Sequence, residues 1–206
     1  MRALTLAILL CLSPAAGNLF AADEVSVEAK RRDDALEVAC RAMLDAPLEL
    51  IWQTLTDYGR LAEFIPGMRR SRVVSQNGPV TVIEQSGDAR FLFVSVPIEV
   101  TLSSTEKPPY VIDGSLLKGN LKKLDGSYRI EPQPGGRVLL TWHGVVEAES
   151  MPPLIGEMLM RSNIEAQFRG MVREIERREA LRRDALRSDA LRRDAERRER
   201  EREPKQ

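Results

Sequence analysis

Histidine and cysteine are scarce in this sequence: its 206 residues include one histidine, His143, and two cysteines, Cys11 and Cys40. Zinc sites in proteins use three or four such side chains, so ligands for a site of this kind are lacking. Strand alternation in residues 137–147 places His143 opposite the more apolar face, and we expect it to be solvated. No sequence neighbour of Cys40 would lower its pKa, which favours a small buried residue over a reactive thiol. We therefore assign no metal ligand, no cofactor and no catalytic residue.

An excess of charge of one sign is also absent. Lys and Arg together number 31, as do Asp and Glu, so the formal net charge is zero. Proteins that follow a nucleic acid backbone need a basic excess, and we expect no nucleic acid partner. The segment DAPLELIWQTLTDYGRLAEFIPGMRRS, residues 45–71, is rich in large apolar side chains but contains no histidine, cysteine or glycine-rich phosphate loop. This pattern favours a binding surface over a catalytic centre.

The start of the sequence lacks an apolar run of transmembrane length, because residues 3–12 fall short of the roughly 20 residues needed. Arg2, this short apolar run and the small residues that follow have the order of a signal peptide. We expect residues 1–22 to be removed by cleavage after Ala21 or Ala22, and the protein to be periplasmic or secreted. An uncleaved membrane anchor is the alternative, and the intact mass of the exported protein distinguishes the two. Cleavage leaves Cys40 as the only cysteine, without a partner for an internal disulfide.

Residues 23–176 have the pattern of one α+β domain. Alternating apolar residues predict two strands in residues 25–44, separated by the charged RRDD. Asp45 is expected to cap a helix that ends near Tyr58, and a short second helix is expected over residues 61–65. Turn signals then predict an antiparallel meander. They lie at residues 76–79, 86–88, 106–109, 118–120 and 133–136. The longest expected strand is FLFVSVPIEVTL, residues 91–102, whose even-numbered positions from Leu92 are all apolar.

A helical pattern begins at Leu154. Its apolar stripe consists of Met160, Ile164, Phe168, Met171 and Ile175. Residues 177–206 form a charged tail with the repeat ALRRD ALRSD ALRRD. A step of five residues advances about 140° beyond a full helical turn, so the leucines spiral around the helix and predict no coiled coil. We expect a solvated helix with weak ion pairs; contact of its arginines with anionic lipid or a partner is the alternative.

The segment APLELIWQTLTDYGRLAEFIPGMRRSRVV, residues 46–74, resembles the START-related polyketide cyclase and coenzyme-Q-binding superfamily, in which a tryptophan-bearing helix runs into DY and an F-x-P-G turn. The later segments RFLFVSV and GNLKKLDGSYRI resemble its long strand and its glycine-marked hairpin, although Tyr128 stands where the family often has tryptophan. The resemblance covers about residues 25–176. It implies a helix-grip fold, in which a curved antiparallel sheet wraps around the long C-terminal helix, with two short helices near the N-terminus.

A cavity between such a sheet and the C-terminal helix would bind a hydrophobic small molecule, and the resemblance implies a lipid or an isoprenoid quinone. The favoured function is non-enzymatic binding or transport, although core packing explains the same residues equally well. The alternative is a cyclase- or dehydratase-like enzyme that uses Glu84, Glu99 or Asp113 from strands. Peripheral membrane contact is a further option, and the oligomeric state is left open. The candidate cavity residues are Trp52, Phe64, Phe91, Phe93, Tyr128, Trp142, Met160, Ile164 and Phe168.

Overall fold

The computed structural model describes residues 25–148 and 153–202. The expected signal peptide, residues 1–22, lies outside the described residues. Within the described part, no helix is long and apolar enough to cross a membrane.

The described chain forms eight strands, three α-helices and one short 3-10 helix. The strands are β1 (Ser26–Arg32), β2 (Ala35–Leu44), β3 (Met68–Asn77), β4 (Val80–Phe91), β5 (Val94–Lys107), β6 (Val111–Gly119), β7 (Leu121–Pro132) and β8 (Val138–Ala148). The helices are α1 (Leu48–Leu55), the 3-10 helix η1 (Tyr58–Arg60), α2 (Leu61–Phe64) and α3 (Pro153–Arg202).

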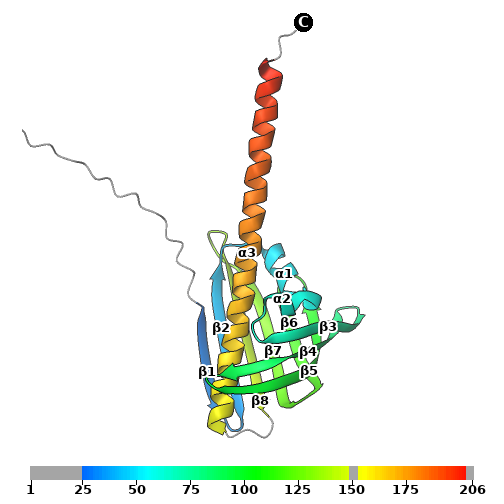
Figure 1. Cartoon of the computed structure of the whole chain (residues 1–206), viewed down its shortest axis with the longest axis vertical. Coiled ribbons are helices and arrows are strands. Elements are labelled where there is room, and N and C mark those ends of the chain that lie inside the picture. Colours follow the sequence, from blue (N-terminus) through cyan, green and yellow to red (C-terminus); the bar gives the residue numbers. More distant parts are fainter. Residues whose placement is uncertain (1–24, 149–152, 203–206) are drawn as a thin grey trace, which may run out of the picture.

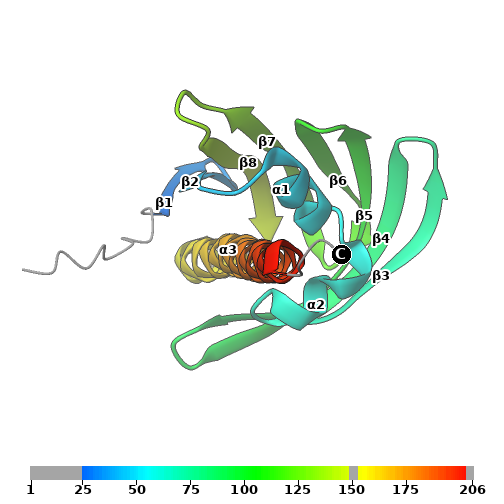
Figure 2. The ribbon, with the colours of Figure 1, turned by 90° about the horizontal axis from the view of Figure 1, so that it is seen from above.

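All eight strands belong to one antiparallel sheet with the order β1-β2-β8-β7-β6-β5-β4-β3. The sheet curves around the first part of α3, and α1 and α2 lie beside that helix at one end of the sheet (Figures 1 and 2). This arrangement confirms the helix-grip fold. It brings β2 and β4, each next to one of the two edge strands of the sheet, against the same helix, α3.

The first two strands follow the predicted alternation. In β2 the side chains that point toward α3 are buried, from Leu36 to Leu44, while the intervening residues are more exposed. The turn between β1 and β2 lies at Asp33, whose φ of 52° suits a short polar residue. The RRDD segment therefore supplies both the polarity and the backbone conformation of this turn.

The predicted strand over residues 91–102 is wrong at its start. Phe91 pairs with Val94, so Leu92 and Phe93 form the turn between β4 and β5. Leu92 has a φ of 51°, and these two side chains are 81% and 94% exposed. The turn lacks Gly, Asn and Pro, the residues that usually mark one, and apolar periodicity alone therefore extended the strand across it.

The turn predicted at residues 86–88 is also wrong, because β4 continues through them. Gly87 serves a close approach between two segments: a Cβ atom added to it would lie 2.3 Å from the carbonyl oxygen of Gly67. Real Cβ atoms essentially never come this close to another atom. The glycine therefore marks a backbone contact inside a strand.

The N-terminal end of α1 also differs from expectation. Pro47 occupies the capping position, with no side-chain cap, and α1 ends at Leu55. The carboxylate of Asp45 instead pairs with Arg183 of α3, at 2.9 Å. Proline tolerates this position because it has no N–H to leave unpaired.

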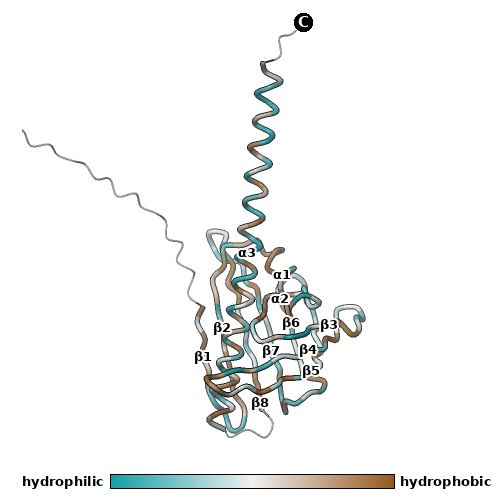
Figure 3. Tube along the Cα trace, in the orientation of Figure 1, coloured by the Kyte–Doolittle hydropathy of each residue, from teal (hydrophilic) through white to brown (hydrophobic). Residues whose placement is uncertain are grey.

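Helix α3 extends well beyond the sheet (Figure 1). Contacts with the domain continue past the apolar stripe, which ends at Ile175: Glu179 is only 4% exposed, as deeply buried as Glu174 at 6%. Arg178 pairs with Asp57 at 2.7 Å. Every described residue from 180 to 199 is exposed, and Figure 3 shows a mostly hydrophilic rod with isolated hydrophobic positions. The tail is thus a solvated helix whose first turns dock on the domain.

Truncation can locate the end of the docked part. A chain that ends after Asp184 should keep the unfolding midpoint of the full chain, because the residues removed are exposed. Ending after Arg178 also removes Glu179 and the Arg183–Asp45 pair, which should cost up to about 1 kcal/mol, since that pair is largely exposed. Thermal unfolding of both variants measures this. Equal loss in both would show that the projecting rod itself stabilises the domain.

Candidate functional site

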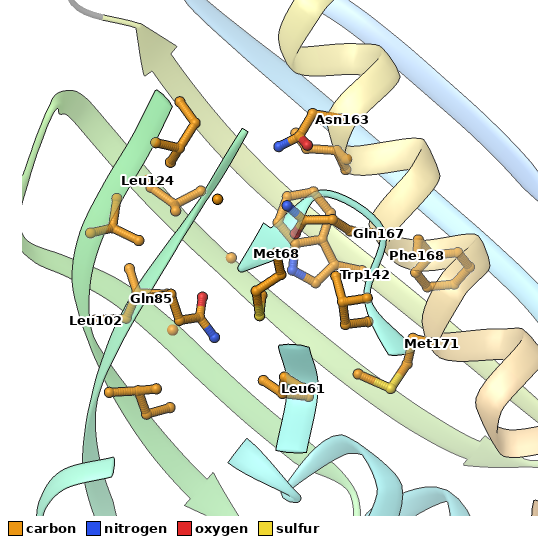
Figure 4. Close-up of a pocket in the computed structure, with 18 of the residues that line it drawn as sticks. Leu61, Met68, Gln85, Leu102, Leu124, Trp142, Asn163, Gln167, Phe168 and Met171 are labelled. Atoms are coloured by element: carbon orange, nitrogen blue, oxygen red, sulfur yellow. The ribbon is translucent and has the colours of Figure 1, made fainter. Parts of the chain in front are cut away.

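A cavity of about 230 Å³ lies between the concave face of the sheet, the α1–α2 segment and α3. Most of its lining side chains are apolar. Figure 4 shows that side chains of the sheet and of α3 point toward the same space from opposite sides. This is the position where the resemblance implied a ligand.

The wall contributed by α3 combines apolar and amide side chains. Met160, Ile164, Phe168 and Met171 line the cavity, together with Asn163 and Gln167. All six lie on one helical face, with the spacing i, i+3, i+4, i+7, i+8 and i+11. Met160, Ile164 and Phe168 were predicted from the sequence as cavity residues, whereas Met171 was predicted only as part of the apolar stripe and the two amides were not predicted. The signal available in the sequence was their position: both amides lie on the helical face that otherwise carries the apolar stripe.

A row of glycines on three neighbouring strands underlies the floor of the cavity, which Gly114 and Gly126 line directly. Gly114 on β6 pairs with Gly126 on β7, which pairs with Gly144 on β8. The indole of Trp142 lies over two of them: an added Cβ would approach this ring to 2.7 Å at Gly126 and to 2.4 Å at Gly144. The absent side chains therefore leave the space in which Trp142 lies flat against the sheet.

An aromatic cluster connects this floor to α3. Tyr128 is the cross-strand partner of Trp142, with ring centroids 6.4 Å apart at a tilt of 56°. Its other neighbour is Phe168, whose ring is nearly parallel to it at 6.4 Å. Burial raises the pKa of Tyr128, so its hydroxyl remains protonated at neutral pH. The cluster fixes the distance between sheet and helix at the cavity wall.

The FIPG turn, residues 64–67, closes the cavity between α3 and β4. Ile65 lines the cavity, and Pro66 packs so tightly on α3 that a Cβ added to Gly170 would lie 2.4 Å from its Cδ. Gly67 adopts a φ of 79°, and a side chain there would meet the carbonyl oxygen of Asp88. The large residues of this motif thus serve a tightly packed turn, and the glycines allow its close contacts.

Five of the nine candidate residues line the cavity: Tyr128, Trp142, Met160, Ile164 and Phe168. The other four do not, and each has a different environment. Trp52 is buried in the core from α1, and Phe64 lies beneath the guanidinium of Arg178, 5.4 Å from ring centroid to Cζ. Phe91 packs against the core at the end of β4, and Phe93 is exposed in the β4–β5 turn.

The carboxylates of the enzyme alternative face away from the cavity. Residues on either side of Glu84, Glu99 and Asp113 line the cavity, so strand alternation directs these three outward. A hydrogen bond from Arg72 lowers the pKa of Glu84, and hydrogen bonds from Lys107 and Ser127 lower that of Asp113. None of the three is placed to exchange a proton with a bound molecule.

The ionisable groups that do line the cavity are engaged or neutral. In the part of the chain that the structure describes, they are Asp88, Tyr58 and Tyr128. Arg69 binds both carboxylate oxygens of Asp88 at 2.8 Å. The Tyr58 hydroxyl donates to Glu106 at 3.0 Å and shares a hydrogen bond with Ser104 at 2.8 Å. Burial raises the pKa of Tyr58 as well.

Histidine and cysteine are placed as the sequence predicted. His143 is exposed on the face of β8 opposite the buried residues. Cys40 is buried, and burial raises the pKa of its thiol to about 12, which disfavours the reactive thiolate form. Among the described residues, no group of three or more His, Cys, Asp or Glu side chains could hold a metal ion.

The model of the family "Polyketide cyclase / dehydrase and lipid transport" matches residues 44–176. No curated protein sequence gives a significant match. The solved structure of the Zhui aromatase/cyclase from Streptomyces sp. R1128 is similar, with 17% identity, a TM-score of 0.62, and coverage of 70% of this chain and 95% of that one.

Two further solved structures share the fold. A START superfamily protein from Mycobacterium smegmatis is 14% identical, with a TM-score of 0.59 over 68% of this chain and 97% of that one. A STAR-related lipid transfer protein from Xanthomonas axonopodis is 9% identical, with a TM-score of 0.59 over 75% of this chain and 99% of that one. At these identities the likeness concerns the fold, which hosts enzymes and carriers alike.

Proposed function

Because the chain belongs to the polyketide cyclase / dehydrase and lipid transport family, we propose that it binds a hydrophobic small molecule in the cavity between the sheet and α3 and carries or sequesters it without chemical change. The family and its neighbours include both enzymes and lipid carriers. The choice between them therefore depends on the side chains that line this particular cavity.

The lining of the cavity is the observation that carries the proposal. General acid–base catalysis needs a group within hydrogen-bond reach of the substrate that can exchange a proton. Both carboxylate oxygens of Asp88 are held by Nη1 of Arg69, and the two tyrosines remain protonated at neutral pH. The apolar residues around them offer a hydrophobic ligand favourable burial, at about 25 cal/mol per Å² of apolar surface. The cavity supports binding better than turnover.

We further propose that the ligand is a lipid- or quinone-type molecule whose compact part occupies the cavity. Methionines 68, 160 and 171 line the wall. Their flexible thioether side chains adapt to irregular apolar shapes. The volume of about 230 Å³ limits how much of a long molecule can be enclosed.

Extraction of the gently purified protein with organic solvent, followed by mass spectrometry, tests this function. We expect a stoichiometric hydrophobic molecule, recovered unchanged. Ile164→Asp places a charge on the cavity wall and should abolish recovery. Leu186→Asp is the matched control, because this leucine lies on the same helix and is 55% exposed. Circular dichroism must show both variants folded.

Two outcomes would contradict the proposal. One is a molecule that the purified protein converts to a different product, which would indicate an enzyme. The other is an empty native protein that binds an apolar fluorescent probe no more strongly than the Ile164→Asp variant does. In that case the cavity is ordinary core packing.

A further inference from the structure

Three carboxamide side chains point into the cavity: Gln85 from β4, and Asn163 and Gln167 from α3. Figure 4 shows Gln85 and Gln167 approaching the same space from opposite walls, with Trp142 beside Gln167. Asn163 and Gln167 are four residues apart and so share one face of the helix. An apolar pocket with a few converging polar groups is the usual form of a small-molecule site.

These amides have almost no partners within the protein. Among the described residues, neither Asn163 nor Gln167 has a hydrogen-bond partner, and the contact of Gln85 with the Ser71 hydroxyl is 3.5 Å long. Asn120, by contrast, binds backbone atoms of Glu99 and Pro97 at 2.9 and 2.8 Å. All three amides are half-buried, and among the described residues no buried side-chain nitrogen or oxygen lacks a partner. Water can therefore hydrogen-bond with them when no ligand is bound. A ligand that displaces this water loses affinity unless it replaces these hydrogen bonds.

The charges around the cavity disfavour a negatively charged ligand. Of the described residues that line it, none is Lys or Arg, and the one that carries a carboxylate, Asp88, is paired with Arg69 and Arg90. A ligand carboxylate or phosphate enclosed here would lack a counter-ion, and an unpaired buried charge is strongly unfavourable. The lining therefore favours a neutral molecule.

The size of the cavity limits the ligand further. An apolar cavity of about 150 Å³ accommodates one benzene ring. The present cavity, at about 230 Å³, is larger by about half. This space suits a single ring or two fused rings. It also suits the ring end of a longer molecule whose remainder lies outside the cavity.

We propose that the cavity selects a compact, uncharged ring compound whose carbonyl or hydroxyl oxygens hydrogen-bond with Gln85, Asn163 and Gln167. This inference rests on the proposed binding function and specifies the ligand class of the same site. The apolar wall supplies affinity for the ring, and the amides distinguish an oxygenated ring from a plain hydrocarbon. Such discrimination arises because an amide left without a partner in the complex is costly.

Isothermal titration calorimetry with three probes of similar size tests the inference. The probes are tetralin, a hydrocarbon; 1-tetralone, which adds one carbonyl; and 1-naphthoate, which is charged. Loss of one neutral hydrogen bond weakens binding by about five- to tenfold. We expect Gln167→Met and Asn163→Leu to weaken 1-tetralone binding by this factor and to leave tetralin binding unchanged or stronger. The wild type should bind 1-naphthoate at least about tenfold more weakly than 1-tetralone.

Gln53→Met is the matched control, because this glutamine lies on the exposed face of α1 outside the cavity. It should bind all three probes as the wild type does. If both amide variants lose tetralin and 1-tetralone equally, or if 1-naphthoate binds as tightly as 1-tetralone, the selection for a neutral oxygenated ring is wrong while the binding function stands. If the wild type binds none of the probes, the binding function itself fails.

Discussion

Replacing Gly144 with alanine should lower the free energy of unfolding by about 2 to 3 kcal/mol and displace Trp142 from the cavity floor. The added Cβ would lie 2.4 Å from two carbon atoms of the indole and 2.7 Å from the backbone oxygen of Asp125. The indole could rotate away, but the strand backbone has little freedom to move. Overpacking of this kind forces side chains from their preferred rotamers.

Gly114→Ala is the control for this prediction. Gly114 belongs to the same row, but a Cβ there would meet only one atom within 4 Å, the Gly126 carbonyl oxygen at 3.8 Å. It should therefore be neutral or slightly stabilising. Urea unfolding gives both free energies, and the near-ultraviolet circular dichroism of tryptophan reports the indole environment. Equal free energies of unfolding for the two variants would show that the packing of Trp142 does not require a glycine at position 144.

Replacing Arg178 with methionine should lower the free energy of unfolding by about 2 to 3 kcal/mol. Its guanidinium binds Glu174 and Asp57, each at 2.7 Å, and lies over the ring of Phe64. The side chain of Glu174 is only 6% exposed, and that of Arg178 is 17% exposed. Removing the cation leaves two partly buried carboxylates with less compensation, which costs much more than the loss of a surface ion pair.

Arg192→Met is the matched control on the same helix, because Arg192 is 72% exposed and pairs with Asp189 at 3.4 Å. It should change stability by less than about 0.5 kcal/mol. Denaturant unfolding of both variants is the measurement. Similar values for the two arginines would show that the buried ion pairs do not hold α3 against the α1–α2 segment.

Acid unfolding provides a second check on these ion pairs. Hydrogen bonds from Arg177 and Arg178 hold the pKa of Glu174 at about 2, below its ordinary value of 4.5. Because the folded-state pKa is the lower one, this stabilisation is present above pH 4.5 and is lost as the pH falls toward 2. A Glu174→Gln variant should lack this part of the acid sensitivity. Parallel pH profiles for the variant and the wild type would contradict the assignment.

The sequence by itself determined most of the elements and, through the resemblance to a known superfamily, the overall fold. Alternation in residues 35–44 and the helical stripe from Met160 to Ile175 follow from the two backbone periods, and burial of one face enforces both. The FIPG motif and its neighbours indicated the superfamily. These signals are local, because each depends on residues a few positions apart.

Only the tertiary structure decided which aromatic residues reach the cavity. Phe93 and Trp142 are both large, apolar and assigned to strands, yet one is in an exposed turn and the other lies on the cavity floor. The difference arises from the β4–β5 register and from the glycines that pair across β7 and β8. Sequence periodicity says which residues share a face, but not what that face meets.

The tertiary structure likewise decided the roles of the polar residues. Glu174 and Glu179 have the spacing of surface helix residues, and they are buried because α3 meets the α1–α2 segment at this point. Asn163 and Gln167 become candidate ligand contacts because β4, far away in sequence, brings Gln85 to the opposite wall. The free energy of a buried polar group depends on which atoms surround it, and those atoms come from distant parts of the chain.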